Sequence, residues 1–267
     1  MTIIEPAGAR SGLLLRADAD GIATLTLNRP AQFNSLSAAL LIELQSAVDE
    51  LASDKSVRVV VIAGVGKAFC AGHDLKELRA HRDRRFAQDV FERFAHVMMS
   101  FTRLPQPVIA RVHGPAFAGG CQLVAQCDLA VASSAATFAT SGINFGLFCN
   151  TPGVSVARNV PRKRAMEMLV TGEAIDADTA LSYGLVNRVA PAERLDEEMA
   201  DLTRLILEKT PIAVSAGKRL FYRQVEADLE EAYRLATEAM VENMMTEDAA
   251  EGIDAFAAKR RPVWKNK

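Results

Sequence analysis

The sequence predicts an α/β (α+β) fold in which a core of strands and helices is followed by a helical C-terminal part. Short apolar strand patterns alternate with helical patterns up to about Pro161, and later patterns are almost entirely helical. The chain has 267 residues, 49% hydrophobic and 24% charged, which is ordinary for a globular protein. We expect a core over residues 1–200 and a helical region over residues 201–267.

The first elements are predicted from local patterns. Two apolar stretches, Leu13–Arg16 and Ile22–Leu27, flank Asp18–Gly21, and Asp-Gly readily takes the positive φ of a tight turn. A β-hairpin is therefore expected. The segment Ser37–Leu51 carries its leucines and a valine on one face, which predicts a helix. The β-branched run Val57–Ala63 predicts a strand that is buried on both sides.

The later elements follow from the same kind of signal. Val108–Val112 and Leu129–Ala132 are predicted strands, and Thr210-Pro211 predicts a helix with proline at its first position. Leu229–Met245 is a predicted helix with an apolar stripe, which indicates a buried contact with either the chain's own core or another subunit. Thr246–Glu251 places acidic residues in the first turn of a last helix, where they favour the helix dipole.

Composition limits the location and the partners. A net charge of −2 argues against nucleic acid and anionic membranes, and no apolar run approaches the ~18–20 residues of a membrane span. Residues 1–10 show no basic segment followed by an apolar one, and Glu5 counts against a mitochondrial presequence. The four cysteines show no metal-ligand spacing. We expect a cytoplasmic protein with reduced, buried thiols and no metal.

One segment is locally basic. The run Lys76–Arg85 is rich in lysine and arginine, but Glu77 and Asp83 interrupt it and no aromatic residue is interleaved. A solvated helix face beside an anionic ligand explains this run better than a nucleic-acid surface.

Two glycine turns are candidates for a functional site. The segment Ala68–Glu77 follows the buried strand, and Ala118–Gln122 contains a second turn that leads into a helix. A turn of this kind leaves free backbone N–H groups at the start of the helix. If the two turns face each other, they form an oxyanion hole, in which each donor is worth ~10²–10³ in rate.

The order and spacing of several segments resemble the crotonase (enoyl-CoA hydratase/isomerase) superfamily over nearly the whole chain. The matching segments are Leu27–Pro30, Ala71–Leu75, His113–Cys121, Ala165–Gly172, Ala180–Val186 and Phe256–Arg260. Within the superfamily, three sequence segments most resemble the subgroup of enoyl-CoA hydratase domain-containing protein 3. These segments are Gly72–Leu75, Ser141–Cys149 and Pro262–Trp264.

The resemblance implies a repeated ββα core that binds acyl-CoA or enoyl-CoA, and a C-terminal helical region that forms a homotrimer or a dimer of trimers. It implies that the thioester carbonyl lies between the N–H groups of His73 and Gly119. The coenzyme A thioester would be the substrate or ligand, with no permanently bound cofactor. The implied coenzyme A contacts are Ala31, Gln32, Phe33, Ala71, Asp74, Leu75, Lys76 and, from a neighbouring subunit, Phe256 and Lys259.

The two catalytic glutamates of the hydratase pattern are absent. In the resemblance their positions are Gln122 and Gly142. Hydration needs a base for water and an acid for the α-carbon, and each such role is worth ~10²–10⁴ in rate. Gln122 can only orient a group, and Gly142 has no side chain. Two alternatives follow: an enzyme with relocated or water-mediated chemistry, or a non-catalytic acyl-CoA binder with a carrier or regulatory role in lipid metabolism.

Other side chains are candidates to substitute for the missing acids. His73 is either a base at neutral pH or a packing residue used only through its N–H. Asp74 is expected to cap the helix that follows it. Cys149 is either a nucleophile or an inert buried thiol, and Asn144 and Asn150 are able to position a water but not to transfer a proton.

Overall fold

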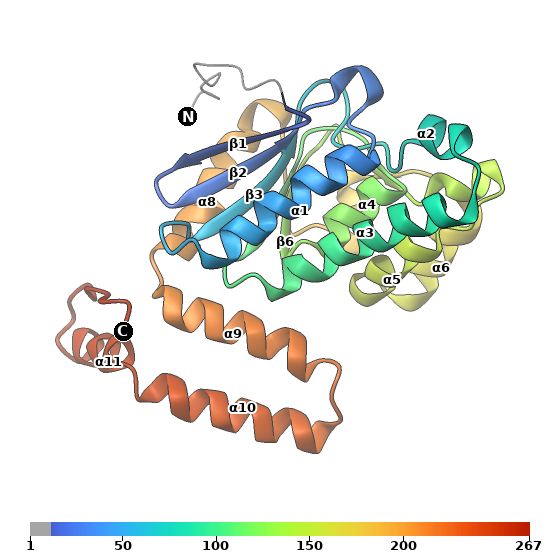
Figure 1. Cartoon of the computed structure of the whole chain (residues 1–267). Coiled ribbons are helices and arrows are strands. Elements are labelled where there is room, and N and C mark those ends of the chain that lie inside the picture. The colour runs from blue at the N-terminus through green and yellow to red at the C-terminus, as the bar shows by residue number, and fades with distance from the viewer. Residues whose placement is uncertain (1–11) are drawn as a thin grey trace.

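The computed structural model describes residues 12–267, and its centre is a six-stranded sheet (Figure 1). Residues 1–10, for which no targeting signal was predicted, lie outside the described residues. The strand order is β1-β2-β3-β4-β6-β9; β1 is antiparallel to β2, and the later pairs are parallel. The strands are β1 (Leu14–Ala19), β2 (Ile22–Leu27), β3 (Val59–Gly64), β4 (Val108–Val112), β6 (Leu129–Ser133) and β9 (Arg188–Ala190).

The N-terminal hairpin is confirmed. Strands β1 and β2 pair from Leu14 opposite Leu27 to Ala19 opposite Ile22. The two residues between them, Asp20 and Gly21, take φ values of 52° and 78°. Positive φ at both central residues is what a two-residue hairpin turn requires, and it is the reason for the Asp-Gly sequence.

Both faces of the sheet are buried. Successive residues of β3 point to opposite faces, so Val60 packs in the cluster with α1 (Ala38–Ser53) and α3 (Arg84–Arg103), whereas Val61 packs in the cluster with α8 (Leu195–Leu207). The prediction of a strand buried on both sides is confirmed, although β3 begins two residues later than expected. The covering helices are α1 (Ala38–Ser53), α3 (Arg84–Arg103) and α8 (Leu195–Leu207).

A smaller, three-stranded sheet and several short helices complete the core. Helix α4 (Gly119–Gln126) follows the end of β5 (Ala116–Phe117) after one intervening residue. The strands and helices are β5 (Ala116–Phe117), β7 (Thr137–Ala139), β8 (Ile175–Asp176), α2 (Leu75–Ala80), α4 (Gly119–Gln126), α5 (Asn150–Asn159), α6 (Arg162–Thr171) and α7 (Ala177–Ser182). The 3-10 turns are η1 (Pro30–Gln32), η2 (Ser141–Phe145) and η3 (Ala192–Arg194).

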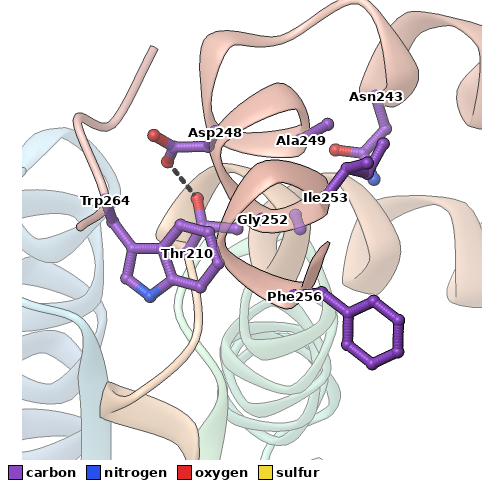
Figure 2. Close-up of a pocket in the computed structure, with 9 residues that line it drawn as sticks. Thr210, Asn243, Asp248, Ala249, Gly252, Ile253, Phe256 and Trp264 are labelled. Atoms are coloured by element: carbon purple, nitrogen blue, oxygen red, sulfur yellow. Dashed lines mark hydrogen bonds between the residues drawn. The ribbon is translucent and has the colours of Figure 1, made fainter. Parts of the chain in front are cut away.

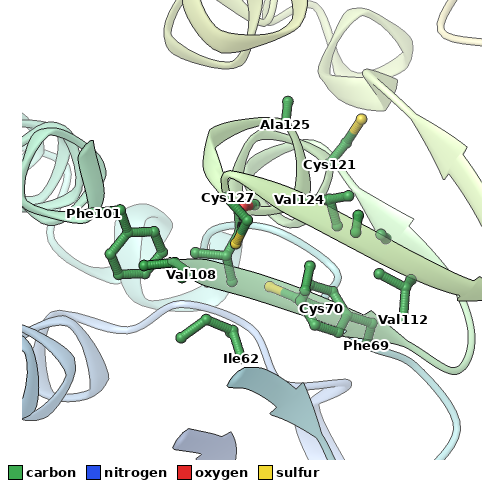
Figure 3. Close-up of a cluster of buried hydrophobic side chains, with 14 of the residues drawn as sticks. Ile62, Phe69, Cys70, Phe101, Val108, Val112, Cys121, Val124, Ala125 and Cys127 are labelled. Carbon is green, nitrogen blue, oxygen red and sulfur yellow. Dashed lines mark hydrogen bonds between the residues drawn. The ribbon is translucent and has the colours of Figure 1, made fainter. Parts of the chain in front are cut away.

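The cysteines are part of the core. All four are free and buried, and Figure 3 shows Cys70, Cys121 and Cys127 among buried apolar side chains. Burial raises the pKa of Cys70 and of Cys121 to about 12. The expectation that the thiols are buried is confirmed.

Three helices form the C-terminal part: α9 (Pro211–Gln224), α10 (Leu229–Met244) and α11 (Glu247–Ala257). Figure 1 shows α9 and α10 side by side and set apart from the sheet, with α10 outermost. Pro211 is the first residue of α9, and the Thr246 side chain caps α11 by accepting from Ala249 N, so both predicted helix starts are confirmed. The division at residue 200 stays a prediction, since α8 runs across it.

The apolar stripe of α10 faces outward. Leu229, Tyr233, Met240 and Met244 are between 53% and 75% exposed. They therefore do not pack onto the core of their own chain, which was one of the two alternatives. Contact with another subunit stays a prediction.

Helix α9 is held to the core by a mostly buried, hydrogen-bonded group, which we call the α9 anchor (Lys218, Tyr222 and Asp128). Lys218 Nζ donates to Asp128 Oδ2 at 2.6 Å and to the carbonyl oxygens of Phe101 and Gln106 at 2.7 and 2.8 Å. The Tyr222 hydroxyl donates to Asp128 Oδ1 at 2.7 Å. The anchor fixes where the C-terminal helices leave the core.

Candidate functional site

The two glycine turns lie against each other. Cys70 forms a parallel bridge with Ala116, and Phe117 N donates to Cys70 O at 2.9 Å. A Cβ atom on Gly120 would overlap the same carbonyl oxygen, so only glycine allows α4 to start this close to the loop after β3. The two turns are therefore in direct contact.

Gly72 makes the second close approach. Its φ is 95°, and a Cβ atom there would lie 2.9 Å from Ala118 Cβ and 3.0 Å from Gly119 N. A side chain at residue 72 is thus excluded by both backbone conformation and space. As a result, the peptide of His73 is held against the first turn of α4.

Two backbone N–H groups remain free at this contact. Within residues 12–267, neither His73 N nor Gly119 N donates a hydrogen bond. Leu36 N donates to Gly72 O at 2.8 Å, and Leu36 O accepts from Asp74 N at 3.0 Å, so neither hydrogen bond uses His73 N. Gly119 is the first residue of α4, where a backbone N–H has no acceptor within the helix. Ala118 has a strained φ of 49°. This conformation fixes the orientation of the peptide group between Ala118 and Gly119, which carries Gly119 N.

The His73 ring is packed rather than solvated. It contacts Phe91 and Phe94 edge-on, each at 4.9 Å between centroids, and its Nδ1 lies 3.2 Å from where a Cβ on Gly119 would be. Among the described residues, its buried Nε2 has no partner. Burial lowers the pKa of His73 to about 4, so the ring is neutral at physiological pH. The geometry favours the packing interpretation over the base.

Acid should destabilise the protein through His73. The folded pKa is about 4 and the ordinary value is 6.5, so the unfolded chain binds the proton more readily. The stabilising difference is complete above pH ~6.5 and is lost as the pH falls towards ~4, by roughly 2 kcal/mol after allowing for partial exposure. Urea denaturation from pH 7 to 4 measures it. His73→Leu should flatten the profile and exposed His96→Gln should not; an unchanged slope in His73→Leu contradicts the assignment.

The two vacated glutamate positions differ structurally. Gln122 is 3% exposed, and its Oε1 has no donor among the described residues. A Cβ atom on Gly142 would lie 2.5 Å from Leu147 O and 2.7 Å from Cys149 Sγ. Gly142 N also donates to that sulfur at 3.2 Å. The place of the second carboxylate is therefore filled by backbone and thiol.

The other substitutes are no better placed for proton transfer. Burial raises the pKa of Cys149, which favours the inert thiol over the nucleophile. Asn144 and Asn150 are exposed, at η2 and at the start of α5.

Most residues implied for coenzyme A binding lie on two linked loops. Ala71 N donates to Phe33 O at 3.0 Å, which joins the loop at η1 to the loop before α2. Exposed on these loops are Ala31, Gln32, Phe33, Ala71, Leu75 and Lys76.

Asp74 is a cap, as expected. It accepts from Lys76 N at 3.1 Å and Glu77 N at 3.2 Å, at the start of α2. It also pairs with Arg29 Nη2 at 2.9 Å. Burial acts to raise the pKa of Asp74, but Arg29 and the N–H groups of Glu77 and Lys76 together lower this pKa below its usual value. The role of Arg29 was missed, because no local pattern signals a partner 45 residues away.

Phe256 and Lys259 lie elsewhere. Phe256 is 87% exposed at the end of α11, where it lines a cavity of about 310 Å³ together with Trp264 and Ile253 (Figure 2). Figure 1 shows α11 at the opposite end of the molecule from α2. A single chain does not bring these residues to the other coenzyme A contacts, and a contribution from a neighbouring subunit stays a prediction.

Over residues 12–267, no three His, Cys, Asp or Glu side chains are grouped to hold a metal ion. In the same range, no helix has the length and apolar character needed to cross a membrane.

Comparison with known families decides the classification. Residues 17–267 match the family described as enoyl-CoA hydratase/isomerase. The chain belongs to the enoyl-CoA hydratase/isomerase family. The resemblance in the motifs and the crotonase fold are both confirmed.

Similar family members include proteins of the expected subgroup. The enoyl-CoA hydratase domain-containing protein 3 of Rattus norvegicus is 45% identical over 98% of this chain and 88% of its own length. The Homo sapiens protein is 48% identical over 92% of this chain and 82% of its own.

Solved structures of the enoyl-CoA hydratase/isomerase family agree with the fold. An enoyl-CoA hydratase from Mycobacterium smegmatis has a TM-score of 0.93 at 56% identity, covering 94% of this chain and 98% of that one. The human domain-containing protein 3 has a TM-score of 0.92 at 47% identity, covering 94% of this chain and all of that one (100%).

The predicted cytoplasmic location is contradicted. The relatives from rat, human, mouse, frog and zebrafish are all named mitochondrial. The prediction failed for a physical reason: reduced cysteines exclude an oxidising compartment but do not distinguish one reducing compartment from another.

Proposed function

We propose that this family member binds a fatty acyl-CoA or enoyl-CoA thioester, with the carbonyl oxygen between His73 N and Gly119 N. The observation that carries the proposal is the pair of N–H groups without acceptors among the described residues, on two turns that come into close contact at Gly72. Two aligned donors polarise a thioester carbonyl and stabilise the enolate derived from it.

Ordinary hydration with two glutamates is not part of the proposal. Gln122 transfers no proton, Gly142 is blocked, and the pKa of His73 of about 4 is far below that of a base matched to neutral pH. The first candidate is an enzyme that stabilises a thioester enolate. The blocked position at Gly142 favours a second candidate, a non-catalytic acyl-CoA binder with a carrier or regulatory role in lipid metabolism.

Coenzyme A itself would contact the two loops around Phe33 and Lys76, with Phe256 and Lys259 supplied by a neighbouring subunit. The exposed stripe on α10 supports a homotrimer or a dimer of trimers, because an apolar face of this kind is typical of subunit contacts. The residues 201–267 would then be the region of oligomerisation.

The test is turnover of crotonyl-CoA, followed by loss of the conjugated thioester absorbance, together with calorimetric binding of butyryl-CoA. We expect binding, with hydration slower than that of an ordinary hydratase by at least ~10²–10⁴. Turnover at the ordinary rate would contradict the role given to Gln122 and Gly142. Failure of both thioesters to bind would contradict the site.

Restoring both carboxylates should not restore hydration. Gln122→Glu preserves the size of the side chain, but Gly142→Glu forces a Cβ against Leu147 O and should destabilise the fold by ~1–3 kcal/mol. Urea denaturation and the crotonyl-CoA assay measure the single and double variants. Gly217→Glu, where a Cβ meets nothing within 4 Å, is the control. Hydration by a stable double variant would show that the loop opens more easily than the structure implies.

A further inference from the structure

The turn after helix α11 carries a lysine where the backbone favours glycine. Lys259 takes a φ of 52°, in the left-handed region that residues with a side chain rarely adopt. Its N–H donates to Phe256 O at 3.1 Å, and Arg260 N donates to Ala255 O at 3.0 Å. These two hydrogen bonds form a Schellman turn, in which the left-handed residue after the helix is usually glycine. The turn itself therefore does not account for a lysine at residue 259.

The Lys259 side chain has no structural task that the described residues reveal. It is exposed, and within residues 12–267 its ammonium group has no ion-pair or hydrogen-bond partner, since the ion pairs of this segment use Arg260 and Lys265. Phe256, three residues earlier, is equally unpartnered at 87% exposure. An exposed phenyl ring beside a free cation suits a ligand that carries an aromatic base and phosphate groups, as coenzyme A does.

Glu251 holds the chain directly after Lys259. Its Oε1 accepts from Arg260 Nη1 at 2.6 Å and from Val263 N at 2.7 Å, and its Oε2 accepts from Arg260 Nη2 at 2.8 Å. A paired contact of this kind fixes a guanidinium group in orientation as well as in distance. The hydrogen bonds from Arg260 and Val263 N lower the pKa of Glu251 to about 2, so its carboxylate is charged at physiological pH.

A second carboxylate of α11 holds the chain further along. Asp248 Oδ1 accepts from Lys265 N at 2.7 Å and from Asn266 N at 3.1 Å, six and seven residues after Lys259. These contacts fix the end of the chain. Of the two carboxylates, Glu251 is the one that holds the residue next to Lys259.

We propose that Glu251 is a positioning residue for coenzyme A binding. By holding Arg260 and Val263 N, it keeps Lys259 in the left-handed conformation and fixes where the Lys259 ammonium group and the Phe256 ring meet a coenzyme A bound to a neighbouring subunit. The inference rests on the proposed function. Glu251 acts through Lys259 and does not contact the ligand. Without the carboxylate, the turn samples several conformations, and ligand binding has to order it.

The experiment measures butyryl-CoA affinity by calorimetry at pH 7 for the full chain, Glu251→Gln, Lys259→Ala and the double variant. We expect Lys259→Ala to weaken binding about fivefold, the scale of one exposed ion pair. Glu251→Gln should weaken binding about threefold, the scale of ordering one side chain. In the Lys259→Ala background it should have no further effect, because the group that it positions is gone. Glu247→Gln, the same chemical change at an exposed residue of α11, should leave the affinity unchanged.

Two further variants separate positioning from folding. Arg260→Met breaks the same contact from a half-exposed side chain and should reproduce the effect of Glu251→Gln, including its absence in the Lys259→Ala background. Lys259→Gly should raise the midpoint of urea unfolding, because glycine suits the left-handed turn, and should weaken butyryl-CoA binding as Lys259→Ala does.

The outcomes distinguish this inference from the proposed function. Additive losses in the double variant, or full affinity in folded Glu251→Gln or Arg260→Met variants, would overturn the positioning role and leave the proposed function in place. Full affinity in Lys259→Ala would overturn the positioning role together with the contribution of the neighbouring subunit. Failure of the unaltered chain to bind butyryl-CoA would overturn the proposed function itself.

Discussion

Gly72→Ala should abolish the polarisation of a bound thioester. Alanine at φ 95° is strained by ~1–3 kcal/mol, and its Cβ would press on Ala118 Cβ and Gly119 N at about 3 Å. Relief of this contact moves His73 N away from Gly119 N. We expect thioester affinity to fall at least about tenfold, and any enolate-forming step to fall by ~10²–10³. The red shift in absorbance of bound cinnamoyl-CoA reports the polarisation directly.

A matched control separates this effect from backbone strain. Gly184 has a similar φ of 78°, but a Cβ there would meet only Asn159 O, at an ordinary 3.4 Å. Gly184→Ala should cost stability and leave the absorbance shift unchanged. A Gly72→Ala variant that keeps the full shift would show that the two N–H groups do not act together on the carbonyl.

Lys218→Met should be the most destabilising change to the C-terminal part. The ammonium group is nearly inaccessible, with 6% side-chain exposure, and it satisfies two carbonyl oxygens and Asp128. Burial lowers the pKa of Lys218, and the carboxylate of Asp128 opposes that shift. Methionine leaves Asp128 buried without its counter-charge, and removal of one partner from a buried ion pair costs about 3–5 kcal/mol.

The loss is measured as the free energy of unfolding in urea. Lys163→Met makes the same chemical change at an exposed position on α6 and should be close to neutral. If Lys218→Met unfolds no earlier than Lys163→Met, the α9 anchor is not what holds the C-terminal helices to the core.

The parts of the fold that sequence could predict are those with local causes. Asp20-Gly21 specifies its own turn, Pro211 starts a helix, and Thr246 caps one. The three-stranded sheet could not be predicted in this way. Its strands β5, β7 and β8 have two or three residues each, too few to show a period, and they exist because distant segments pair.

The candidate site also combines features with local sequence causes and features that depend on distant segments. The glycine turns and the loss of two carboxylates are visible in the sequence. The ion pair of Arg29 with Asp74 and the burial of the His73 ring between Phe91 and Phe94 depend on tertiary packing. The crowding at Gly142 likewise depends on tertiary structure, because the chain folds back and places Leu147 O and Cys149 Sγ against this residue. A glycine in the sequence does not by itself predict such a contact.

The contact between Gly142 N and the Cys149 thiol also limits which substitutions the fold tolerates at residue 142. A carboxylate at residue 142 requires the sulfur and the Leu147 peptide to move first, and neither move has a benefit while the carboxylate is absent. A substitution at residue 142 alone therefore gives a destabilised chain, and a carboxylate is accommodated there only together with changes at Leu147 or Cys149.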